Sequence, residues 1–157
     1  MKRSRGFTLI ELVITVAIVA LIAGAAMPFT ELTVRRAKEQ ELHAALRDIR
    51  TAIDAYKAAA DAGRVERDVD ATGYPPTLDA LFSGVEDITS PDKKMIYFIR
   101  RIPRDPFFPD GTVPASETWG LRSYASPPDD PAPGDDVYDV YSLASGASLN
   151  GSPYREW

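Results

Sequence analysis

Near the start of the chain stands the sequence Gly6-Phe7-Thr8-Leu9-Ile10-Glu11-Leu12, and an apolar stretch continues from it to Pro28 and Phe29. As a helix, residues 7–29 would reach about 34 Å at about 1.5 Å per residue, and the hydrocarbon core of a bilayer is about 30 Å thick. The stretch is therefore long enough to span a membrane once. Glu11 is an acid inside it, and an unpaired charge at full depth costs about 3 kcal/mol or more. We therefore expect Glu11 to have a cationic partner.

Two simpler interpretations of this region stay open on pattern alone. Lys2, Arg3 and Arg5 form a basic segment before the apolar stretch, and the small residues 23–25 are suited to cleavage of an ordinary secretory signal peptide. A plain single-span anchor is the other interpretation. Neither explains why a glycine and a carboxylate stand at the beginning of the apolar stretch.

The motif at residues 6–12 resembles the cleavage and methylation signal of type IV pilin-like proteins. The resemblance implies that a membrane peptidase cuts after Gly6, that the new N-terminal Phe7 is N-methylated, and that Glu11 directs assembly. Physical chemistry is consistent with these roles, because glycine has no side chain to obstruct a protease and a buried carboxylate requires a cation. In a filament of this family, that cation is the free amine of Phe7 from a neighbouring subunit.

Amphipathic periodicity follows the apolar stretch. Leu42, Leu46, Ile49, Ile53 and Tyr56 recur at spacings of three and four, with charged residues between them. Because no glycine lies between Gly24 and Gly63, we expect one long helix that ends near Gly63 and is kinked at Pro28. The predicted fold is α+β: this helix, membrane-spanning in its first half and amphipathic in its second, packs on a small antiparallel sheet, and the C-terminal region is rich in loops.

Shorter elements are predicted beyond the helix. A short helix follows Thr77, which we expect to cap it, and Gly84 should end it. Residues 95–99 form an apolar run that fits either a strand or a buried helix. Strands are expected around residues 122–125 and over residues 137–142, and the proline-rich residues 127–136 between them should form a loop.

Composition excludes several classes of protein. The 157 residues carry a formal net charge of -5, and loss of the three basic residues before Gly6 makes the chain more acidic, so we expect no nucleic-acid partner. The chain has no cysteine and therefore neither a disulfide nor a thiolate metal site. His43 is the one histidine, on a helix with no catalytic motif around any serine. We expect a structural or solvated His43 and no enzymatic activity.

Four further motifs follow in order: residues 74–78 (Tyr-Pro-Pro-Thr-Leu), 102–106 (Ile-Pro-Arg-Asp-Pro), 119–120 (Trp-Gly) with Tyr124, and 138–143 (Tyr-Asp-Val-Tyr-Ser-Leu). Together they resemble the major, G-type pseudopilin of type II secretion systems. Two departures stand out. An insertion at residues 107–117 separates two motifs that lie close together in that family. The family also has a calcium-holding aspartate-glycine loop after its last long strand, and residues 144–151 of this chain contain no acid.

Calcium normally requires several oxygen ligands, including carboxylates. We therefore predict that the chain needs no cofactor and holds no metal. The alternative is a calcium ion held by upstream acids, with Asp135 and Asp136 as the candidates. Residues 154–157, which include Tyr154 and Trp157, are expected to close the C-terminal loop by aromatic packing.

The resulting hypothesis is a structural pseudopilin. Residues 1–6 are its leader peptide, residues 7–29 its transmembrane or filament-core helix, and residues 30–157 a periplasmic pilin-like globular domain that includes the second half of the helix. The resemblance implies a single-pass inner-membrane protein with a cytoplasmic N-terminus that polymerises into a periplasmic filament. Its implied partners are a prepilin peptidase and methyltransferase, further copies of itself, minor pseudopilins and an inner-membrane assembly platform. A type IV pilus subunit for adhesion, motility or DNA uptake, and a membrane-anchored binding module that never polymerises, are the alternatives.

Overall fold

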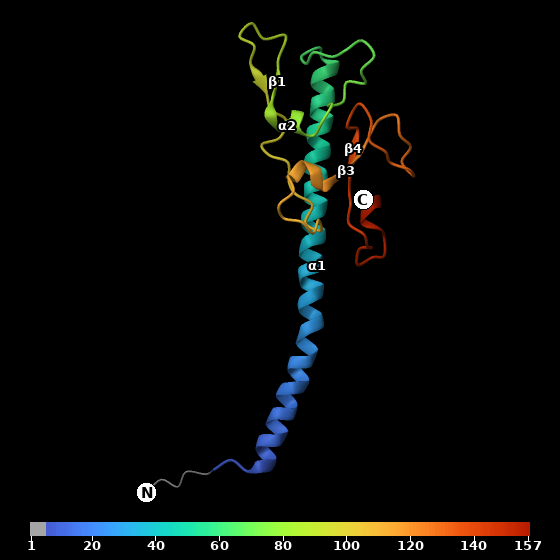
Figure 1. The fold of residues 1–157 in the computed structure, drawn as a ribbon. Helices are drawn as coiled ribbons and strands as arrows, with labels where there is room; N and C mark the ends of the chain where they lie inside the picture. The colour runs from blue at the N-terminus through green and yellow to red at the C-terminus, as the bar shows by residue number, and fades with distance from the viewer. Residues whose placement is uncertain (1–5) are drawn as a thin grey trace. The chain divides into compact units, whose positions relative to one another are not determined.

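The computed structural model of the chain describes the backbone of residues 6–157 and the side chains of residues 6–24 and 30–157. Its largest element is α1, Leu9–Asp61, a helix of 53 residues (Figure 1). Contacts divide the chain into two units, with the boundary between Ala37 and Lys38 inside this helix. The predicted single long helix is confirmed, and its end lies two residues before Gly63.

The first unit consists of the N-terminal part of α1 and the residues before it. Every side chain at residues 6–24 is exposed. Within the described residues, no helical stretch is both long enough and apolar enough to cross a bilayer. Pro28, the predicted kink, falls among residues 25–29, whose side chains are outside the described part, and the basic residues 2, 3 and 5 are also outside it.

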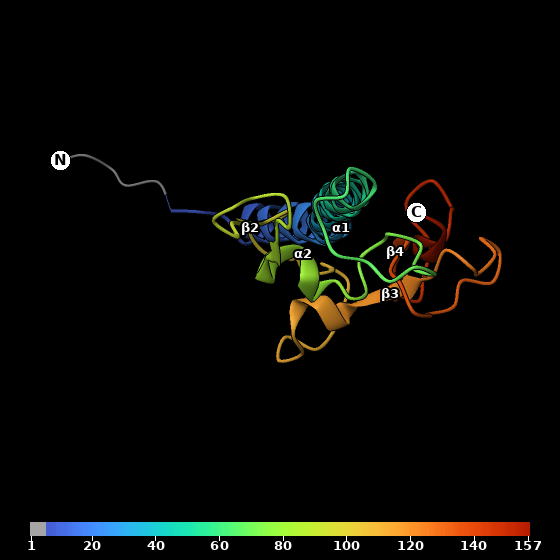
Figure 2. The same ribbon diagram turned by 90° about the horizontal axis from the view of Figure 1, so that it is seen from above.

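The second unit is built on one face of α1. The side chains of Leu42, Leu46, Ile49 and Ile53 are at most 1% exposed, and they follow each other at spacings of three and four residues. The predicted amphipathic stripe is therefore confirmed as the core. In Figure 2, α2, β3 and β4 lie on the same side of this half of α1. The other buried hydrophobic residues of the core are Ala45, Ala52, Tyr56, Ala59, Ala60, Val65, Leu78, Leu81, Ile102, Trp119, Val137, Val140 and Tyr154.

The chain after α1 forms a short helix and a small hairpin. Helix α2 is Asp79–Ser83, and Gly84 ends it at a φ of 88°, a backbone conformation that favours glycine. The predicted cap at Thr77 is wrong: Leu78 occupies the cap position, and no side chain makes a capping hydrogen bond. Leu78 is buried in the core, so packing rather than capping fixes where this helix starts.

Strands β1, Val85–Glu86, and β2, Met95–Ile96, pair antiparallel. Residues 95–96 of the ambiguous apolar run are therefore strand. The hairpin is attached to the end of α1 by Arg64, whose guanidinium donates to Asp87 at 2.6 and 3.0 Å. Thr89 donates a further hydrogen bond to Asp87, and this bond, followed by the Arg64 guanidinium, lowers the pKa of that carboxyl.

The C-terminal third contains a second antiparallel pair. The 3-10 helix η1, Ala115–Thr118, leads into β3, Trp119–Arg122, which pairs with β4, Asp139–Ser142, so that Trp119 lies opposite Ser142. Only Arg122 of the strand predicted around residues 122–125 belongs to β3, which begins earlier because the buried Trp119 is part of it. β4 begins two residues after the predicted start at residue 137. In the described part of the chain, the predicted small sheet is thus two separate pairs of short strands. The last element is the 3-10 helix η2, Tyr154–Glu156.

Polar contacts hold β4 against neighbouring segments. The Arg50 side chain on α1 donates to the Asp139 carboxylate at 2.7 Å and to the Val140 carbonyl at 3.1 Å. Asp105 is 1% exposed and accepts a hydrogen bond from the Ser142 hydroxyl at 2.6 Å. The strands are short and form few main-chain hydrogen bonds, so these side-chain hydrogen bonds also hold β4 in place.

Gly120 in β3 lies against the ring of Tyr141 on β4, and a Cβ at this position would overlap the ring atoms. We expect Gly120→Ala to destabilise the fold by about 1–3 kcal/mol, the usual cost of overpacking, and to lower the melting temperature by several degrees. Thermal unfolding followed by circular dichroism measures this change. Gly111→Ala is the matched control, because a Cβ there meets nothing within 4 Å; equal melting temperatures for the two variants would contradict the packing of Tyr141 on Gly120.

Candidate processing and assembly site

The segment before α1 is open to solvent. Gly6, Phe7 and Thr8 have no regular structure, and the Phe7 side chain is 80% exposed. A Cβ at Gly6 would meet nothing within 4 Å. The peptide bond between Gly6 and Phe7 is therefore sterically accessible, as a cleavage site requires.

Thr8 and Glu11 together cap the N-terminus of α1. The Glu11 amide donates to the Thr8 hydroxyl at 3.3 Å, and the Glu11 carboxylate accepts from the Thr8 amide at 3.4 Å. These reciprocal bonds form a capping box, which satisfies donors that a helix start leaves free. This role was not among those expected of Thr8 and Glu11, although a threonine three residues before a glutamate, ahead of an apolar run, is the pattern that predicts it.

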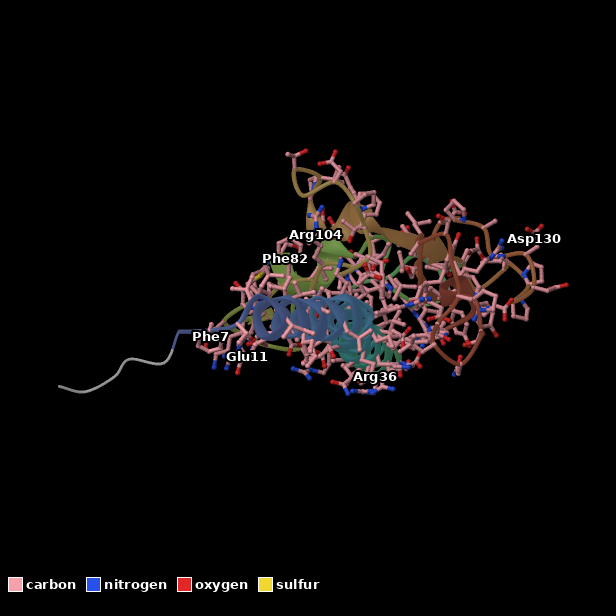
Figure 3. All side chains as sticks on the ribbon, turned by 90° about the horizontal axis from the view of Figure 1, so that it is seen from below. Phe7, Glu11, Arg36, Phe82, Arg104 and Asp130 are labelled. Carbon is pink, nitrogen blue, oxygen red and sulfur yellow. The ribbon has the colours of Figure 1, made fainter. Side chains whose placement is uncertain are left out.

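The Glu11 carboxylate has little holding it in place. Its two contacts, from the amide and the hydroxyl of Thr8, are both 3.4 Å long. Glu11 is exposed, and no cation pairs with it among the residues that the structure describes. Phe7 and Glu11 lie near each other at this end of the helix (Figure 3). The arrangement leaves a carboxylate available to a cationic partner.

Large hydrophobic side chains cover the helix after Glu11 and remain exposed in the isolated chain. Isolated exposed hydrophobic residues are ordinary, whereas a long continuous apolar surface marks a contact with lipid or protein. The side chains involved are Leu9, Ile10, Leu12, Val13, Ile14, Val16, Ile18, Val19, Leu21 and Ile22, each more than 50% exposed.

The two calcium candidates have different surroundings. Asp135 is exposed, but Asp136 is 7% exposed and accepts hydrogen bonds from the Ser123 hydroxyl at 2.9 Å, the Tyr124 amide at 2.8 Å and the Thr72 hydroxyl. Burial alone would raise the pKa of Asp136, but the hydrogen bonds from Thr72, Tyr124 and Ser123 outweigh burial and lower it. In the residues with described side chains, no three histidine or acidic groups come together in a way that could hold a metal ion. Asp136 therefore acts as a structural acceptor that ties the loop of residues 123–136 to Thr72.

Known proteins match both the N-terminal motif and most of the remaining chain. A profile described as the prokaryotic N-terminal methylation motif matches residues 1–27. The type II secretion system core protein G of Dickeya chrysanthemi is 25% identical over 155 residues, which cover 96% of this chain and 94% of that protein. The protein of the same name from Klebsiella michiganensis is 26% identical over 139 residues, covering 86% of this chain and 90% of its own length. No solved structure gives a significant match.

The chain is therefore similar to the G-type, type IV pilin-like pseudopilins, both at its N-terminal motif and along most of its length. The resemblance inferred from the N-terminal motif and from the later motifs is confirmed by both comparisons. The matched motif contains Gly6, Phe7 and Glu11. No comparison tests the role of each residue, so cleavage after Gly6, methylation of Phe7 and assembly through Glu11 stay predictions.

The lowered pKa of Asp136 predicts a defined response to acid. Its pKa in the folded state lies below 3.8, the ordinary value for this side chain. A depressed folded pKa contributes stability that is present above the unfolded value and is lost as the pH falls through the folded value. We expect Asp136→Asn to lower stability at neutral pH and to weaken the further loss of stability below about pH 3.8.

Denaturant unfolding of the full chain in detergent, at neutral and at strongly acidic pH, measures this difference. Asp135→Asn is the control, because that exposed neighbour makes none of the three hydrogen bonds of Asp136. A wild-type acid response in Asp136→Asn would show that the three hydrogen bonds do not stabilise the folded carboxylate.

Proposed function

We propose that this pseudopilin is made as a membrane-inserted precursor, is cut after Gly6 and methylated on Phe7, and then polymerises into the periplasmic pseudopilus of a type II secretion system. The observation that carries the proposal is the position of the motif at the start of an exposed apolar helix, in a chain similar along most of its length to core protein G. The function is structural, and we propose no enzymatic activity.

Before assembly, the apolar first half of α1 requires an apolar environment. We propose that residues 7–29 lie in the inner membrane, with the N-terminus in the cytoplasm and residues 30–157 in the periplasm. Burial of apolar surface is worth about 25 cal/mol per Å², so the ten exposed hydrophobic side chains of residues 9–22 favour lipid strongly over water. In the filament, neighbouring copies would replace lipid around the same surface.

Cleavage after Gly6 would create a cation for Glu11, which has none among the residues that the structure describes. The new amine of Phe7 has an ordinary pKa near 8 and is positively charged at neutral pH. In an apolar filament core, a carboxylate and an amine from adjacent subunits stabilise each other, whereas either group alone is costly to bury. The long capping contacts from Thr8 are weak competitors, so we expect Glu11 to exchange them for the amine of Phe7 when a subunit joins the filament.

Assembly would also involve other proteins. We propose a prepilin peptidase and methyltransferase, minor pseudopilins and an inner-membrane assembly platform as partners, because their counterparts serve this class of subunit. The chain has no segment that we would assign to nucleic-acid binding. A surface type IV pilus subunit remains the nearest alternative, and the location of the filament separates it from a periplasmic pseudopilus.

The first prediction concerns processing. We expect the mature protein to begin at Phe7, to carry one added methyl group and to retain residues 7–29, because the cleavage motif precedes the apolar helix. Intact-mass measurement of the protein from membranes tests this, and Gly6→Val, whose side chain obstructs the peptidase, should accumulate as the uncut precursor. A mature N-terminus near residue 26 would instead identify an ordinary signal peptide.

The second prediction concerns Glu11. Glu11→Ala removes a charge from the apolar helix and should leave membrane insertion intact or improved, but it should abolish or sharply reduce the polymer. Immunoblots of sheared filaments and of membranes measure the two quantities separately. Glu31→Ala, which removes an exposed acid from the same helix, should polymerise normally. Wild-type polymer yield in Glu11→Ala would rule out pairing of Glu11 with the amine of Phe7.

A further inference from the structure

The C-terminal loop of residues 144–152 is where a G-type pseudopilin would be expected to hold calcium. The loop contains no carboxylate, and the side-chain oxygen of Asn150 already accepts from the Ser152 amide at 3.1 Å, the Ser152 hydroxyl at 2.8 Å and the Ser148 hydroxyl. Neutral oxygens that bond to each other are a poor set of ligands for a divalent cation. The residues of this loop do not fit calcium.

The loop is instead bonded to a carboxylate on helix α1, that of Glu39. The Glu39 carboxylate accepts from the Leu149 amide at 2.9 Å and from the Tyr154 hydroxyl at 2.8 Å. Both bonds go to the same oxygen, Oε1. Hydrogen bonds to an ionised acceptor are about twice as strong as neutral ones. Glu39 thus places a negative charge next to the main chain of the loop. The donors that bond to this charge are groups of the protein, the Leu149 amide and the Tyr154 hydroxyl.

Aromatic rings extend this contact on both sides. Phe107 stacks on Tyr154 with ring centroids 4.4 Å apart, and Tyr154 meets Trp157 edge-on at 5.3 Å. Trp157 in turn stacks on His43 of α1 at 3.8 Å, with the ring planes 9° apart. Phe107 is the first residue of the insertion that distinguishes this chain from the family it resembles. The two departures in the sequence therefore meet at one place in the structure.

The end of the chain is fixed by the same face of α1. The Arg50 guanidinium donates to the main-chain oxygen of Trp157 at 2.7 Å, and the Trp157 indole donates to the Ser152 hydroxyl at 2.9 Å. Tyr154 is 3% exposed. Trp157 is thus bonded to the loop at Ser152, and side chains of α1 bond to both the loop and Trp157.

We propose that Glu39, Phe107, Tyr154 and Trp157 form a latch that holds the C-terminal loop to α1 in place of a metal ion, so that this subunit folds independently of calcium. The latch performs the task that a bound cation would have in such a loop, which is to hold its main chain in place. Its hydrogen bonds fix the main chain at Leu149, and its rings stack on one another and on His43 of α1. Because the latch consists of side chains of the protein, which cannot dissociate as an ion can, the fold does not depend on the calcium concentration of the compartment.

Hydrogen exchange of the full chain in detergent, followed by mass spectrometry of peptides from residues 146–157, tests the latch directly. We expect the same exchange rates and melting temperature in chelator and in millimolar calcium. Glu39→Ala should increase exchange in these peptides by roughly tenfold to a hundredfold, the range for loss of a hydrogen bond to a charged group, and calcium should not reverse the increase. Glu41→Ala, which removes an exposed acid two residues away, should exchange like the wild type.

Tyr154→Phe is the second variant, because it removes only the hydroxyl that donates to Glu39 and keeps the stacked ring. We expect a smaller increase in exchange than in Glu39→Ala. The proposal would be overturned by slower exchange or a melting temperature several degrees higher in calcium, which is the effect of a ligand that binds only the folded state. Wild-type exchange in Glu39→Ala would overturn it equally. The assay measures the folding of one subunit. Neither result therefore bears on the proposed polymerisation, which the Glu11 variant tests separately.

Discussion

The apolar stripe on the second half of α1 is the constraint on which the second unit depends. Leu42, Leu46, Ile49 and Ile53 are almost fully buried, and the segments that follow the helix have little regular structure of their own. Strands of two to four residues do not make an independent sheet, because small isolated hairpins are marginally stable in water. They are held because each contributes an apolar side chain to the core that contains this stripe, or packs one against that core.

Side chains from α1 and its end then fix the position of each segment. Arg64 holds the β1–β2 hairpin through Asp87, Arg50 holds β4 through Asp139, and Glu39 holds the C-terminal loop through Leu149 and Tyr154. Helix α1 is the one element that the two units share. It carries the exposed apolar side chains of the first unit and the buried stripe of the second.

Sequence predicted the parts of the molecule that follow from periodicity and strong local signals. The long helix, its buried stripe, the stop at Gly84 and the proline-rich loop all agree with the structure, because each depends on neighbouring residues in the chain. Thr77 failed as a cap because burial of Leu78 determines where α2 begins. The start of β3 was missed because Trp119 is placed by the core and by its hydrogen bond to the Pro103 carbonyl, a contact across sixteen positions.

The residues of the candidate sites also divide into those that a local sequence motif predicts and those whose roles depend on contacts with distant residues. Gly6, Phe7 and Glu11 were found because their motif is contiguous, and the capping role of Thr8 was visible in the sequence but overlooked. Asp136 was identified as an acid in a loop, but its partners Thr72 and Ser123 are distant in sequence, so neither its burial nor its structural role could be predicted. Glu39 belongs to the same class, because it lies 110 positions from Leu149, whose amide it binds.

Electron cryomicroscopy of filaments sheared from cells that overexpress the chain would show how the subunits pack. We expect filaments in which residues 7–24 of many copies pack together in the core, with each Glu11 carboxylate next to the Phe7 amine of a neighbour and the globular units outside. Filaments whose core is formed by the globular units, with the apolar helices away from one another, would contradict it.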